Sequence, residues 1–180
     1  MSHADVPIVV RPAETGDLAT INDIYNHYVH TSTCTYQEEP EPIDTRRAWF
    51  DRHPPERYPV LVACAASPGG EIVGWGALSP YRERSAYRFS VENSVYVRPD
   101  WQRRGVGSAL LRDLVARAKG IGFRTILAGI DAEQTASVAL HAKQGFVQTA
   151  HLRQVGFKFG RWLDVYYMQL ILTDEATDVG

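Results

Sequence analysis

The sequence has little of what marks several large classes of protein. Its 180 residues include two cysteines, Cys34 and Cys64, which are too few for a disulfide framework and do not have the spacing of a metal site. No apolar run approaches the ~18 residues that span a bilayer, and residues 1–10 lack the pattern of a signal peptide. We therefore expect a soluble, cytoplasmic protein with free thiols and no membrane contact.

An excess of charge of one sign is also missing. The chain has 19 Lys and Arg against 21 Asp and Glu, a formal net charge of −2. A protein whose main task is to follow a nucleic-acid backbone carries a clear positive excess, so this balance argues against a nucleic-acid partner. His27, His30, His53 and His151 have no metal-ligand spacing with cysteine or aspartate, so we expect no metal.

What is present is the composition of a globular domain, with 44% hydrophobic and 22% charged residues. At this length we expect one domain. Residues 173–180 are polar and acidic and show no apolar period. The sequence therefore predicts a single domain over residues 1–172 followed by a short C-terminal tail.

Hydrophobic periodicity predicts strands interleaved with helices. The predicted helices are residues 14–30, 44–53, 105–119 and 135–144. The predicted strands are residues 8–11, 59–65, 72–78, 89–97, 125–130, 146–151 and 162–172. This alternation indicates a sheet domain of the mixed α/β or α+β class.

The most informative segment is residues 102–108, Gln-Arg-Arg-Gly-Val-Gly-Ser, between a predicted strand and the most regular predicted helix. Gly105 and Gly107 allow a tight turn and the close approach of a ligand. The first turn of the helix offers unpaired N–H groups and a positive dipole end, which suit a diphosphate. Leu110 stands where a dinucleotide fingerprint needs its third glycine, and no P-loop sequence follows. The segment favours phosphate binding outside those two motifs.

This segment resembles the signature of the GNAT superfamily of N-acetyltransferases, Gln/Arg-x-x-Gly-x-Gly/Ala, and the resemblance extends over roughly residues 8–172. It implies an α+β fold, a mostly antiparallel mixed sheet of about seven strands flanked by about four helices. It also implies acetyl-CoA as co-substrate. The residues that it assigns to acetyl-CoA are Val95, Tyr96, Val97, Arg103, Arg104, Gly105, Val106, Gly107, Ser108, Gln134 and Lys143. Gln134 stands where the family usually has asparagine, and its longer arm is expected to shift or lose that contact.

Four separated segments resemble a narrower branch, the phosphinothricin and methionine sulfoximine acetyltransferases. They are residues 24–26, 84–97, 136–146 and 156–165. The resemblance implies acetylation of the α-amino group of a small amino acid such as L-phosphinothricin or L-methionine sulfoximine or sulfone. Glu92 would act as the general base, since an ammonium must lose a proton before it attacks. His141 would protonate the departing thiolate. The acetyl group would pass directly from the donor to the amine in a ternary complex.

The acceptor's carboxylate calls for cationic or hydroxyl donors. The branch uses the positions of Arg84 and Tyr87 near its substrate, and Thr35 and Tyr36 lie in a predicted loop that would close over it. Members of the branch are commonly homodimers, and the segment around Trp162 is a candidate for the interface.

Other functions stay open at this point. A second amine class (a protein N-terminus, an aminoglycoside or a polyamine) would keep the fold and the donor, and Glu38, Glu39 and Glu41 suit a polyamine. A CoA-binding sensor without turnover is a different class, against which Glu92 and His141 argue. A nucleic-acid binder is suggested only by Arg103 and Arg104 and by the segment Arg82 to Arg88, and the balanced charge opposes it.

Overall fold

The computed structural model describes residues 6–66 and 69–172, so the predicted tail lies outside the described residues. Its seven strands form one sheet in the order β1-β2-β3-β4-β5-β7-β6. The strands are β1 (Ile8–Pro12), β2 (Val60–Ala65), β3 (Ile72–Pro80), β4 (Ser90–Val97), β5 (Thr125–Asp131), β6 (Val147–Lys158) and β7 (Arg161–Ile171). The α-helices of the described residues are α1 (Leu18–Thr31), α2 (Ile43–Asp51), α3 (Val106–Ile121) and α4 (Thr135–Lys143).

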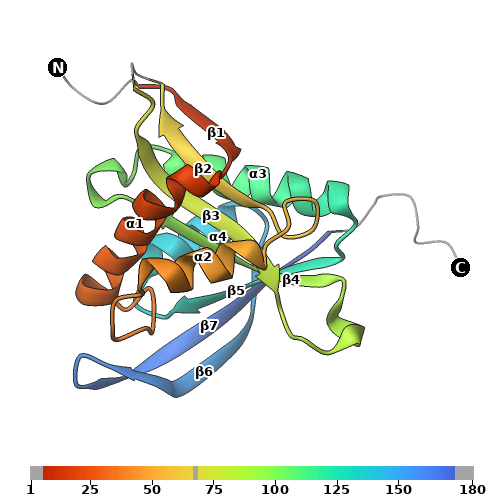
Figure 1. The fold of residues 1–180 in the computed structure, drawn as a ribbon. Coiled ribbons are helices and arrows are strands. Elements are labelled where there is room, and N and C mark those ends of the chain that lie inside the picture. Colours follow the sequence, from red (N-terminus) through yellow and green to blue (C-terminus); the bar gives the residue numbers. More distant parts are fainter. Residues whose placement is uncertain (1–5, 67–68, 173–180) are drawn as a thin grey trace, which may run out of the picture.

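Neighbouring strands pair antiparallel throughout, except that β4 and β5 are parallel. The helices form a layer on each face of this sheet (Figure 1). On one face, Ile21 of α1 and Trp75 of β3 belong to one buried apolar cluster. On the other, Leu110 of α3 and Ile126 of β5 belong to a second. The predicted mostly antiparallel α+β fold is confirmed.

All predicted elements form, with differences at their ends. The first helix begins at Leu18, because residues 15–17 form a 3-10 turn. β6 continues to Lys158, well past its predicted end, since its pairing with β7 resumes at Gly156 after an irregular stretch. Within that stretch Gln154 has φ +51°. Such a bulge interrupts the alternation of side chains, which hid the second half of the strand from the sequence pattern.

The sheet opens where β4 and β5 part. Their pairing covers Ser90–Glu92 of β4 and Thr125–Leu127 of β5, and no more. Beyond Glu92, β4 stays paired with β3, and β5 stays paired with β7. The second half of β4 therefore has backbone groups on one side without a partner in β5. None of the described helices is long and apolar enough to cross a membrane.

Candidate active site

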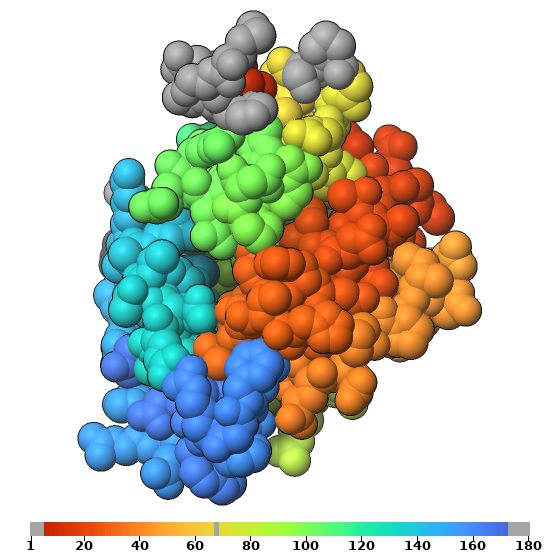
Figure 2. Space-filling view, turned by 90° about the vertical axis from the view of Figure 1, so that its left-hand side faces the viewer, coloured from red at the N-terminus to blue at the C-terminus, as the bar shows by residue number. Residues whose placement is uncertain are grey.

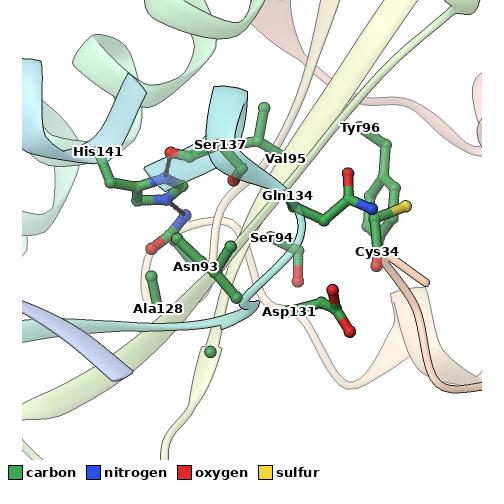
Figure 3. A pocket seen from close by; sticks show the side chains of 12 residues that line it. Cys34, Asn93, Ser94, Val95, Tyr96, Ala128, Asp131, Gln134, Ser137 and His141 are labelled. Carbon is green, nitrogen blue, oxygen red and sulfur yellow. Dashed lines mark hydrogen bonds between the residues drawn. The ribbon is translucent and has the colours of Figure 1, made fainter. Parts of the chain in front are cut away.

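Two adjoining cavities follow the unpaired half of β4. The inner cavity, of about 80 Å³, lies where β4 and β5 part (Figure 3). The outer cavity, of about 460 Å³, reaches the start of α3. In the space-filling view the start of α3 (green), α4 (cyan) and α1 (orange-red) surround a hollow (Figure 2). The two cavities form one site, because both are lined by Cys34, Val95, Tyr96, Gln134 and Ser137.

The outer cavity has the features that a diphosphate requires. Gly105 has φ +81° and precedes the first residue of α3, a backbone shape that other residues rarely adopt. A β-carbon on Gly107 would lie 3.1 Å from the Leu140 side chain, so glycine lets α3 and α4 approach closely. These glycines line the cavity with Arg103 and Ser108 at the N-terminus of α3. Unpaired N–H groups and a guanidinium there favour a phosphate.

Most residues predicted to bind acetyl-CoA lie along this outer cavity. They are Val95, Tyr96, Val97, Arg103, Gly105, Gly107, Ser108, Gln134 and Lys143. Val106 and Arg104 do not line it. The Val106 side chain is fully buried in the core, because its helical position faces the sheet. The Arg104 guanidinium lies over the Trp101 ring, 5.1 Å from its centre.

Glu92 is the last residue of β4 that pairs with β5. Its half-buried carboxyl lies beside Gly129 of β5, where a β-carbon would come within 3.2 Å of Oε1. Burial raises the pKa of Glu92, while a hydrogen bond from the Gly129 backbone and the charge of Arg82 act in the opposite direction. A carboxylate with a raised pKa is a stronger base, which suits the predicted proton acceptor.

His141 is buried on α4, and both of its ring nitrogens have partners (Figure 3). Nδ1 lies 2.8 Å from the Ser137 carbonyl oxygen, which can only accept, so Nδ1 carries a proton. Nε2 lies 3.0 Å from Nδ2 of Asn93, so in the neutral ring Nε2 accepts. Burial lowers the pKa of His141. The arrangement therefore favours a neutral ring that holds the Asn93 amide in one orientation.

The turn after α1 carries the predicted acceptor residues Thr35 and Tyr36. Thr35 is buried, and its hydroxyl lies 2.9 Å from that of Tyr25. The Tyr36 hydroxyl donates to the Asp131 carboxylate at 2.9 Å. Both hydroxyls thus have partners within the protein, and they shape the turn rather than point freely into a cavity.

Gln134 connects α4 to the same turn. Its Nε2 lies 3.3 Å from the Ser32 hydroxyl and 3.2 Å from the Thr33 hydroxyl. The longer arm that replaces the usual asparagine therefore spans from α4 to the turn after α1. Because Gln134 lines both cavities, this link stands at their junction.

Arg84 and Tyr87, the other predicted acceptor residues, lie in the exposed segment between β3 and β4. Together with Arg82 and Glu83 they line a third cavity, separate from the inner one. The structure therefore does not bring them to the residues around His141. Arg82 is exposed, yet its charge acts on Glu92.

Sequence reasoning missed Asn93, Asp131 and Lys158. Asn93 is a polar residue between Val91 and Val95 on a strand face that is otherwise apolar, which was the available signal. Lys158 stands in a segment that the family resemblance singled out without giving the lysine a role. Asp131 ends β5, and nothing in its local sequence distinguished it.

The features described so far are shared with a known family. Residues 21–146 match the acetyltransferase (GNAT) family. The chain belongs to the GNAT family. GNAT enzymes use acetyl-CoA as co-substrate, which agrees with a diphosphate site at the start of α3. Within the described residues there is no group of three or more His, Cys, Asp or Glu side chains that could hold a metal.

Individual GNAT relatives cover most of the chain. It is 40% identical over 163 residues to an L-methionine sulfoximine/L-methionine sulfone acetyltransferase of Pseudomonas aeruginosa, over 91% of this chain and 94% of that protein. It is 43% identical over 161 residues to a phosphinothricin N-acetyltransferase of Alcaligenes faecalis, over 89% and 80%. A Salmonella typhimurium protein solved with its cofactor acetyl-CoA has a TM-score of 0.88 and 38% identity, over 94% and 96%. The predicted GNAT membership and acetyltransferase class are confirmed.

Proposed function

We propose that this protein acetylates the α-amino group of a small amino acid such as L-phosphinothricin, L-methionine sulfoximine or L-methionine sulfone. The observation that carries the proposal is the half-buried Glu92 carboxyl at the parting of β4 and β5. It lies against Gly129, which lines the inner cavity, and that cavity continues to a diphosphate site. Two relatives that cover most of this chain are named for these acceptors.

Acetyl-CoA supplies the acetyl group as an activated thioester. At the outer cavity, the N-terminus of α3 with Gly105 and Gly107 would hold the diphosphate. The backbone of Val95–Val97, unpaired on the β5 side, would hold the pantetheine arm. The residues present therefore fit the co-substrate.

Glu92 removes a proton from the acceptor's ammonium, directly or through one water, because only the neutral amine can attack. Positioned proton transfer of this kind contributes about 10²–10⁴-fold to a rate. Its raised pKa makes the Glu92 carboxylate a stronger base, which suits it to accept this proton.

His141 is the proposed proton donor to the departing sulfur. In the structure its Nε2 accepts from Asn93. A second proton must therefore bind at Nε2, and the Asn93 amide must turn, before His141 can donate from this nitrogen.

We propose direct transfer, without an acetyl-cysteine. Neither cysteine lies in the cofactor loop of residues 102–108, although Cys34, in the turn after α1, lines both cavities. Burial raises the pKa of the Cys34 thiol. The thiol is therefore protonated at neutral pH and is a weak nucleophile.

For the acceptor's anionic groups we propose Arg84 and Tyr87, whose guanidinium and hydroxyl match a carboxylate or a phosphinate. They line a cavity separate from the inner one, but Arg82 of the same cavity lies near enough for its charge to act on Glu92. Thr35 and Tyr36 would contribute through the shape of the turn that they stabilise, because their own hydroxyls have partners.

The free thiols Cys34 and Cys64 support action in the reducing cytoplasm.

We also propose a homodimer through the β6–β7 hairpin. β6 is an edge strand, and Val155, Phe157, Phe159 and Trp162 on this hairpin are each more than half exposed. An apolar surface of this kind is typical of an interface, and a second copy of the chain is the proposed occupant. Light scattering should give twice the chain mass, and Trp162→Ser should give the single mass.

Release of CoA thiol from acetyl-CoA by the purified protein tests the activity. The panel of amines contains the three proposed acceptors, common L-amino acids, a polyamine and a short peptide. Saturable turnover on the proposed acceptors is the expected result. Turnover on the peptide or polyamine alone would contradict the acceptor class. Binding of acetyl-CoA with no turnover on any amine would favour a sensor.

A further inference from the structure

A buried lysine has no part in the steps described above. Lys158, the last residue of β6, is 1% exposed. Its Nζ donates to the carbonyl oxygens of Ser32 at 2.7 Å and Thr35 at 2.8 Å, and it lies over the Phe159 ring. Among the described residues no carboxylate is within ion-pair distance of it. A buried ammonium is costly unless such contacts replace its water.

The contacts of Lys158 close the turn after α1. One ammonium binds a carbonyl on each side of Cys34, so it joins the two halves of the turn. Cys34 lines both cavities and thus stands at the junction of the site. The turn that carries Cys34 forms part of the cavity wall. Its position therefore depends on a side chain from β6, more than 120 residues away along the chain.

We propose that Lys158 is a positioning residue for the acceptor end of the site. By joining Ser32 to Thr35 it holds Cys34 at the junction of the two cavities and fixes the wall against which the acceptor binds. The effect on the acceptor rests on the proposed function. The position of the turn does not, and it can be measured in the absence of any acceptor.

The first measurement is the rate at which a disulfide reagent such as dithiobis(nitrobenzoate) modifies each thiol. Lys158→Met keeps the apolar stem and removes the donors. In this variant we expect Cys34 to react about tenfold faster or more, because the turn opens when two charge-assisted hydrogen bonds are lost. Cys64, buried in β2, is the internal control and should react at its wild-type rate.

The sign of this change separates position from electrostatics. The Lys158 charge lowers the pKa of the Cys34 thiol. Loss of that charge alone would raise this pKa, reduce the thiolate fraction and slow the reaction. A faster reaction at Cys34 therefore reports release of the turn.

The second measurement separates the two substrates. In Lys158→Met we expect the KM of the acceptor to rise about tenfold, while the Kd of acetyl-CoA by calorimetry changes less than about threefold. Lys158→Arg keeps N–H donors and should recover part of both the slow Cys34 reaction and the low KM. Lys119→Met, an exposed lysine of α3, should leave all three quantities at their wild-type values.

An unchanged Cys34 rate in Lys158→Met would overturn the proposal. So would an equal acceleration at Cys34 and Cys64, which would mean general loosening of the fold. Equal losses for acceptor and acetyl-CoA would also count against it. If no amine is acetylated at all, the proposed function fails, and the thiol rates still decide whether Lys158 holds the turn.

Discussion

The ring of Tyr36 packs directly against the backbone of Gly156. A β-carbon at position 156 would overlap two atoms of this ring. Only glycine on β6 therefore leaves Tyr36 room to lie where its hydroxyl reaches the Asp131 carboxylate. The contact joins the turn after α1 to the hairpin, beside the contacts made by Lys158.

Gly156→Ala should lower the free energy of unfolding by about 1–3 kcal/mol, the usual cost of overpacking. Tyr36 must also move, so the KM of the acceptor should rise. Urea denaturation and steady-state kinetics measure the two effects. Gly120→Ala is the matched control, because a β-carbon there meets nothing within 4 Å and alanine favours the helix. Equal stability of the two variants would contradict the packing argument.

The turnover rate should depend on the ionisation of Glu92. Only the carboxylate accepts a proton, so kcat should rise with pH through the pKa of Glu92, which burial raises above that of an ordinary glutamate. Glu92→Gln should lower kcat by about 10²–10⁴-fold and remove this acidic limb. Glu133→Gln, an exposed glutamate paired with Arg161, should keep the limb. A limb that persists in Glu92→Gln would assign the base elsewhere.

Cys34→Ala should retain turnover. The thiol lies at the junction of the cavities, yet direct transfer gives it no covalent step. We expect kcat within about threefold of wild type, a change that corresponds to less than 1 kcal/mol. Loss of turnover together with an intact Kd for acetyl-CoA would point to an acetyl-cysteine instead.

Two glycines allow backbone strain to be separated from ligand binding. Gly105 has φ +81° at the start of α3, and Gly122 has φ +88° just after its end. Alanine at either position should cost about 1–2 kcal/mol of stability. Only Gly105→Ala should also weaken acetyl-CoA binding, because only Gly105 lines the outer cavity. Calorimetry that shows equal Kd values for the two variants would argue against the diphosphate site.

The pKa of His141 should depend on the side chain at position 93. In the folded protein burial lowers the pKa of His141 below that of the unfolded chain, about 6.5. The unfolded chain then binds the proton first, so stability present above that pH is lost as the pH falls toward the folded pKa. Asn93→Asp places an anion next to Nε2 and should raise the pKa. Titration of the ring by NMR checks this, and an unchanged or lower pKa in the variant would refute it.

Local patterns predicted the strands, the helices and the cofactor loop, because each depends on neighbours within a few residues. The glycines of residues 105–107 could be placed for that reason, whereas the role of Glu92 came only from the family resemblance. The second half of β6 was missed because a bulge at Gln154 interrupts the alternation. The partners of Gln134 and Lys158 lie on the turn after α1, more than 100 residues away along the chain. Which loop meets which strand is decided by packing, and no single-sequence pattern carries that information.

The parallel contact between β4 and β5 is a narrow seam. It joins three residue pairs, ending at Glu92 and Leu127, whereas the β3–β4 and β5–β7 ladders beside it join seven pairs each. The sheet thus consists of two halves with long hydrogen-bonded ladders, which a short parallel ladder joins to each other. If the halves tilt about this seam, displacement grows with distance from it. A tilt of this kind would change the width of the outer cavity most and move the carboxylate of Glu92 least.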